Sequence, residues 1–144
     1  DFDKVVHYIQ IAQDIYIQEL LGTKLYNKIQ SDILGNVLAG DYLDLVKNYV
    51  RPILAQYTFL EFLPFAQYSL NNKGIFKHTS EAAELPGVNE IVKMQEATRD
   101  TAQHYSKRLV DYLCAFPNKF PEYLTNNLND VRPTKDITFG GWQI

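Results

Sequence analysis

The sequence predicts an all-α protein: a helical bundle with two long antiparallel helices, a long loop or small β-hairpin between them, and an extended C-terminal arm. Apolar residues recur at steps of three and four along most of the chain, which is the spacing of one helix face. Glycine and proline fall between these stretches, where helices begin and end. The 144 residues fit one domain, so we assign residues 1–128 to the bundle and residues 129–144 to the arm.

Two shorter helices come first. Asp3 can cap the first helix, whose apolar face continues as far as Gly22. Thr23 then starts a second helix that ends at Gly35. The sequence therefore predicts two helices before the longest apolar stretch.

That stretch, Asp41 to Ala66, predicts a central and largely buried helix. Pro52 lacks a backbone donor and crowds the preceding turn. Either the helix kinks near Tyr49, or one helix ends and another begins with Pro52 in its first turn. We favour a kinked continuous helix because the apolar spacing runs through Pro52 in phase, and Pro64 then bends or ends it.

A polar loop, residues 70–86, follows the central helix. Its turn signal lies between short β-compatible pieces, so we expect a loop or small β-hairpin that projects from the helices. Long ordered loops commonly carry function, although this composition also fits a mobile solvated loop. The candidate partner-binding residues in the loop are Asn72, Lys73, Gly74, Ile75 and Phe76.

A second long helix is predicted from Val88 to Phe116, with its charged residues largely off the apolar line. At 1.5 Å per residue it should span about 40 Å. Pro117 and Pro121 end it, and a last short helical turn follows at residues 120–124.

The arm ends in an apolar tip. Exposed aromatic and β-branched residues on a flexible arm leave apolar area uncovered, so the tip should dock on a partner. Two adjacent glycines permit close backbone approach. The alternative is that the arm folds back on its own helices. The candidate partner-binding residues in the arm are Arg132, Phe139, Gly140, Gly141, Trp142 and Ile144.

Composition excludes several classes of protein. A net charge of −3 argues against a dedicated nucleic-acid binder. The single cysteine, Cys114, allows neither an internal disulfide nor a thiolate zinc cluster, so we expect an intracellular chain without metal. No apolar run approaches the roughly 18 residues of a membrane span, and no signal peptide is visible. Ten tyrosines suggest a Tyr-rich surface suited to protein contacts.

No catalytic site is apparent. Asp100 and His104 lie four residues apart with Glu96 one turn earlier, but ligands on one helix do not make a metal site, so we interpret them as a solvated face. His7 and His78 have no carboxylate or nucleophile at motif spacing. The sequence holds no phosphate loop, nucleophile elbow or HExxH motif, and we expect neither an enzyme nor a cofactor.

Arg51 is a charged residue in the most apolar part of the chain, where an unpaired charge would be costly. Its side chain should reach outward to solvent, pair with an acid such as Glu61 or Asp100, or contact another subunit.

Six segments, in their order along the chain, carry a family resemblance: IQIAQDIYIQELLGTKLYNKI (9–29), NYVRPILAQYTFLEFLPFA (48–66), LNNKGIF (70–76), YSKRLVDYLC (105–114), FPEYLTNN (120–127) and FGGW (139–142). Together they resemble the small head-to-tail connector, or adaptor, proteins of tailed bacteriophages, closest to those of crAss-like phages and Bacteroidetes prophages. The similarity covers nearly the whole chain.

The resemblance implies a structural virion protein, assembled in the host cytoplasm, that forms an oligomeric ring, commonly a dodecamer, between the portal and the tail or neck. Its partners would be further copies of itself, the portal protein and tail or stopper proteins; DNA would only pass through the channel, and no membrane would be involved. The family's loop corresponds to residues 70–86 and its arm to residues 129–144. Stoppers and tail-completion proteins are similar, so these roles stay open.

Two interpretations from other classes remain. One is a ligand- or metal-binding helical domain of unknown activity that uses Asp100, His104 and the tyrosines. The other is a DNA-binding regulator, whose duplex affinity would depend strongly on salt.

Overall fold

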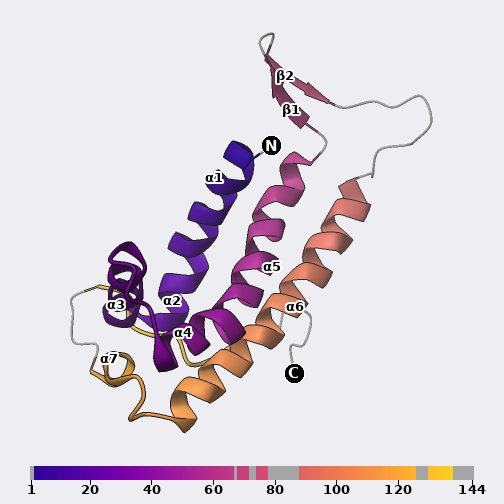
Figure 1. Cartoon of the computed structure of the whole chain (residues 1–144). Coiled ribbons are helices and arrows are strands. Elements are labelled where there is room, and N and C mark those ends of the chain that lie inside the picture. Colours follow the sequence, from indigo (N-terminus) through magenta and orange to yellow (C-terminus); the bar gives the residue numbers. More distant parts are fainter. Residues whose placement is uncertain (1, 67, 72–73, 78–87, 126–129, 138–144) are drawn as a thin grey trace, which may run out of the picture.

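The computed structural model describes residues 2–66, 68–71, 74–77, 88–125 and 130–137. Helices dominate the described chain (Figure 1), and the all-α prediction is confirmed. None of the helices in this part of the chain combines the length and apolar composition that crossing a lipid bilayer requires.

The first helix is continuous but not uniform. It consists of α1 (Phe2–Ala12), a π-helical turn (η1, Gln13–Ile17) and α2 (Gln18–Leu21). Gly22 ends it with φ of 77°, a conformation that glycine adopts at little cost. The next helix, α3 (Thr23–Leu34), ends at Gly35 as predicted; Gly35 keeps a right-handed conformation, and the positive φ of 56° falls on Asn36.

The central stretch stays helical throughout. It runs through α4 (Gly40–Leu45), a π-helical turn (η2, Val46–Val50), α5 (Arg51–Phe62) and a 3-10 turn (η3, Leu63–Phe65). The amide of Arg51 donates to the carbonyl of Val46, five residues back, just before Pro52. The wider turn precedes the proline ring, which would crowd a regular α-helical turn. The prediction of one continuous helix is confirmed.

Two short strands follow. β1 (Tyr68–Asn71) pairs antiparallel with β2 (Gly74–Lys77), with Tyr68 opposite Lys77 and Asn71 opposite Gly74. They lie beyond the ends of α1 and α5 (Figure 1).

The longest helix, α6 (Val88–Ala115), lies beside α5 and runs in the opposite direction (Figure 1), and the short α7 (Pro121–Leu124) follows it. Helices α1, α5 and α6 are side by side, and α3 lies on the flank away from α6. Their facing sides form the core. Its most enclosed side chains come from five helices: Leu21, Leu25, Leu45, Ile53, Leu109, Leu113 and, before α7, Phe120.

Candidate protein-binding site

The described half of the arm docks on its own helices. The amide of Thr23 donates to the carbonyl of Val131 over 3.0 Å, and the amide of Thr134 donates to the carbonyl of Glu19 over 2.8 Å. Ile137 packs against the core cluster. The alternative in which the arm folds back on its own helices therefore holds for residues 130–137.

Only some of the site residues predicted from the sequence belong to the described part of the chain. Arg132 is exposed. Phe139, Gly140, Gly141, Trp142 and Ile144 lie outside the described residues, as do Asn72 and Lys73 of the loop. Gly74, Ile75 and Phe76 form most of β2, where the backbone pairing alone is described.

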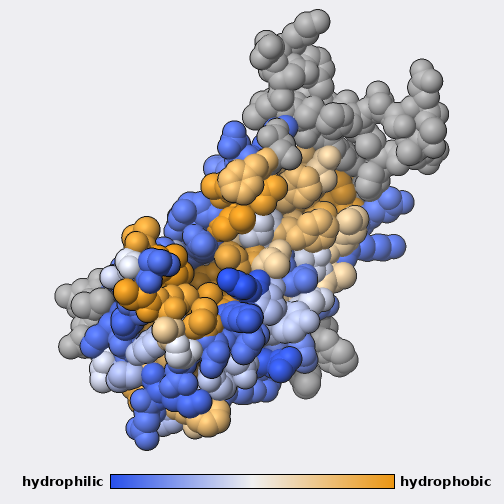
Figure 2. All heavy atoms as spheres, in the orientation of Figure 1, coloured by the Kyte–Doolittle hydropathy of each residue, from blue (hydrophilic) through white to orange (hydrophobic). Residues whose placement is uncertain are grey.

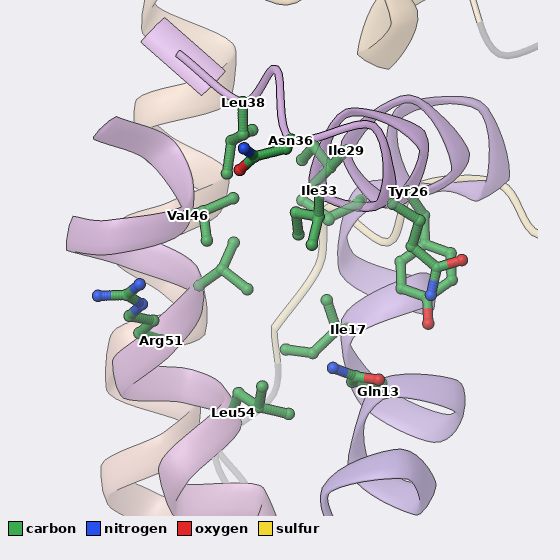
Figure 3. Close-up of a pocket in the computed structure, with 13 residues that line it drawn as sticks. Gln13, Ile17, Tyr26, Ile29, Ile33, Asn36, Leu38, Val46, Arg51 and Leu54 are labelled. Carbon is green, nitrogen blue, oxygen red and sulfur yellow. The ribbon is translucent and has the colours of Figure 1, made fainter. Parts of the chain in front are cut away.

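An open groove that the sequence did not predict lies between α3 and the continuous helix of α4 and α5 (Figure 3). It has a volume of about 380 Å³. Both π-helical turns line it, through Gln13 and Ile17 of η1 and Val46 and Val50 of η2. Most of the remaining lining is aliphatic: Leu21, Ile29, Ile33, Leu38 and Leu54. A concave, largely apolar surface of this size is typical of binding sites.

Polar groups stand at separated points of the groove. Gln13, Gln30 and Asn36 line it, and the side-chain amide of each can both donate and accept hydrogen bonds. Tyr26 forms part of the wall, and its buried hydroxyl has no hydrogen-bond partner among the described residues. Burial, followed by the charge of Asp14, raises the pKa of Tyr26.

Arg51 stands at the rim of the groove. Its stem contributes to the lining, and its guanidinium points away from the centre (Figure 3). Within the described chain no ion pair involves Arg51, so the alternative in which it pairs with Glu61 or Asp100 is wrong. Glu61 instead accepts a hydrogen bond from the hydroxyl of Tyr16 over 2.6 Å. The exposed guanidinium is free to meet solvent or another molecule.

The rim beyond the groove is also apolar. Ile33, Leu34 and Val37 have exposed fractions of 53%, 88% and 64%. Figure 2 shows hydrophobic side chains gathered around α3, and a second group near the ends of α1 and α5 that face the hairpin. Phe2 and Phe65 are exposed at that end, at 78% and 54%. The described residues of one copy therefore present two exposed apolar surfaces.

The tyrosines whose side chains are described do not form this surface, which corrects the expectation of a Tyr-rich exterior. Every tyrosine side chain that the structure describes is buried or half-buried. Tyr16 stacks on Tyr57 at 3.8 Å between ring centroids, and Tyr49 stacks on Tyr112 at 4.3 Å. Burial and the hydrogen bond to Glu61 raise the pKa of Tyr16. The tyrosines hold the bundle together, and phenylalanine and aliphatic residues supply the exposed apolar area.

A second tyrosine–carboxylate pair links distant parts of the chain. The hydroxyl of Tyr42 donates to Glu122 over 2.7 Å, which joins α4 to α7. Burial, followed by this hydrogen bond, raises the pKa of Tyr42.

The candidate metal ligands on α6 do not form part of a metal-binding cluster in the described chain. Glu96, Asp100 and His104 are exposed on α6. Within the described residues, no three side chains of His, Cys, Asp or Glu gather closely enough to hold a metal ion. Cys114 is exposed.

A sequence model of a family of unknown function, DUF6712, matches residues 17–133. The match covers most of the chain. The chain belongs to the DUF6712 family. No curated protein and no solved structure matches it. The DUF6712 match includes nearly all the groove residues, Gln13 excepted, and it ends before the apolar tip of the arm.

Proposed function

We propose that this DUF6712 protein is a head-to-tail connector of a tailed bacteriophage, a structural virion protein that forms a ring between the portal and the tail or neck and extends the DNA channel. The observation that carries the proposal is the apolar surface left uncovered on a single copy, at the groove rim and at the hairpin end of the bundle. Soluble monomers seldom expose contiguous apolar patches unless these bind a partner.

A ring contact suits two different surfaces on one chain. In a heterologous interface, one patch of a copy meets another patch of the next copy, and the contact repeats until the ring closes. The exposed apolar rim beside α3 and the apolar end of the bundle near the hairpin are two such patches. The six sequence segments that resemble phage connectors support a ring of twelve copies with a portal as its neighbour.

The elements take defined places in this proposal. Helices α5 and α6 are the two long antiparallel helices of the connector bundle, and the β1–β2 hairpin is its projecting loop. Residues 130–137 anchor the arm on its own copy, and the tip docks on a neighbouring subunit or on the portal. The proposal needs no catalytic group.

Electron microscopy of the chain mixed with the portal protein of the same phage or prophage tests the proposal. We expect a ring attached to the narrow end of the portal. Particles of portal alone, beside an unassembled chain, would contradict it.

A ligand-binding domain is the second candidate, because the groove volume of about 380 Å³ is within the range of small-molecule sites. It predicts a small molecule that copurifies with the chain and is visible by native mass spectrometry. The connector proposal predicts masses that the polypeptide accounts for, as one copy or several, without a bound small molecule.

A further inference from the structure

We infer that the groove between α3 and α5 receives residues 138–144 of a second copy of this chain, with Trp142 as the apolar anchor. The inference rests on the proposed assembly of copies, and it names the surface on which the end of the arm docks.

The groove and the exit point of the arm are on different sides of the molecule. Ile137, the last described residue, lines a second cavity together with Tyr57 of α5 and Gln103 of α6. No described residue of α6 lines the groove. In Figure 3 the pale trace of the arm is seen through the gap between the helices that form the groove. Ile137 therefore lies away from the groove of its own copy, and a copy that stands beside this one offers another groove.

The segment is long enough for this contact. Seven extended residues span up to about 24 Å, roughly twice the diameter of a helix. Its apolar residues, Phe139, Trp142 and Ile144, match the aliphatic walls of the groove, and Gly140 and Gly141 have no side chain to hold the backbone away.

The polar groups of the groove suit an extended peptide better than a purely apolar ligand. A docked backbone must hydrogen-bond its N–H and C=O groups once water is displaced. The amides of Gln13, Gln30 and Asn36 supply donors and acceptors, and the guanidinium of Arg51 supplies donors at the rim. The amide oxygens can also accept from the indole N–H, which needs a partner when buried.

Because Trp142 is the only tryptophan in the sequence, its fluorescence reports docking directly. We expect the emission of the full chain to shift to shorter wavelength as protein concentration rises, in parallel with the mass from light scattering. Emission typical of exposed tryptophan at every soluble concentration would overturn the inference. A shifted emission in a monomer, independent of concentration, would overturn it as well, because the tip would then dock on its own copy.

A matched pair of variants tests the groove itself. Ile33→Asp places a charge on the groove rim, and Ile15→Asp is the control. The exposed fractions are similar, 53% for Ile33 and 46% for Ile15, but Ile15 lines neither the groove nor the cavity beside Ile137. We expect Ile33→Asp to raise the concentration of half-association about tenfold or more and Ile15→Asp to leave it unchanged. Circular dichroism checks that both variants fold. Equal effects of the two variants would reject the groove as the docking surface.

The outcome separates this inference from the proposed function. A ring that forms on the portal while Trp142 stays exposed would reject the groove contact and leave the connector proposal intact. Docking of Trp142 between copies without any binding to the portal would support the groove contact and count against the connector.

Discussion

Gly22 faces Pro133 so closely that a β-carbon at position 22 would lie 2.6 Å from Cγ of the proline. Gly22 separates α2 from α3, and Pro133 lies in the arm, between the residues that hydrogen-bond to Thr23 and Glu19. The break between the first two helices is therefore also the place where the arm is fixed to the bundle.

Gly22→Ala should destabilise the chain by about 2–4 kcal/mol, because a positive φ is strained for alanine and the methyl group would displace Pro133. Gly40→Ala is the control: Gly40 also has a positive φ, of 62°, but a β-carbon added there would meet no atom of the described chain within 4 Å. It should cost only about 1–2 kcal/mol. Denaturant unfolding measures both. Faster amide exchange at Thr134 in Gly22→Ala alone would identify release of the arm, and equal costs in the two variants would show that the Pro133 contact contributes nothing.

Tyr26→Phe should leave stability unchanged or raise it by up to about 1 kcal/mol, because it removes a buried hydroxyl that has no partner in the described chain. Tyr16→Phe, which removes the hydrogen bond to Glu61, should instead cost about 1–2 kcal/mol. Chemical denaturation compares the two variants. A large loss of stability in Tyr26→Phe would mean that its hydroxyl has a partner after all.

Stability should decline in alkaline solution. The pKa values of Tyr16 and Tyr42 are raised in the folded chain, first by burial and then by their hydrogen bonds to carboxylates. A raised folded pKa contributes stability that is complete below the unfolded value of about 10 and is lost as pH rises above it. Ionisation of these two tyrosines should not change the melting temperature between about pH 7 and 9. It should lower the melting temperature above about pH 10.

The double variant Tyr16→Phe, Tyr42→Phe should show a shallower decline above about pH 10 than the parent chain, since it lacks two of the groups that ionise. An identical pH profile would show that these tyrosines are not responsible for the alkaline loss.

The helices were predictable because their signals are local. Apolar spacing located α3 and α6, and continuity of that spacing through Pro52 located one unbroken central helix. The π-helical adjustment before Pro52 was not predicted, because sequence spacing does not distinguish a kink from a widened turn.

The groove and the tyrosine contacts depend on tertiary packing and were missed. Nothing near Glu61 or Glu122 in the sequence indicates that each accepts a hydrogen bond from a tyrosine 45 or 80 residues away. Arg51 was singled out as a costly charge, but its position on a groove rim depends on how α3 packs beside α5. The return of residues 130–137 onto α2 depends on backbone hydrogen bonds, which side-chain patterns do not encode.

Two truncations separate the roles of the arm. Deletion of residues 138–144 should leave helicity and melting temperature nearly unchanged, because it keeps the hydrogen bonds to Thr23 and Glu19 and the packing of Ile137 on the core. It should abolish assembly on the portal, because the contact between copies is lost. Deletion of residues 130–144 should also destabilise the bundle, since it removes the hydrogen bonds to Thr23 and Glu19. Circular dichroism and a pull-down with the portal protein measure these effects. If the chain that lacks only residues 138–144 still assembles on the portal, the tip is not needed for assembly.

The most direct test of the connector account is cryo-electron microscopy of the full chain with its portal protein, and with the chain alone as the control. The account predicts a closed ring of this chain seated on the portal, in which the rim around Ile33 and Leu34 is covered by a neighbouring copy. A chain that remains a monomer in both samples, with that rim exposed to solvent and no density on the portal, would contradict it.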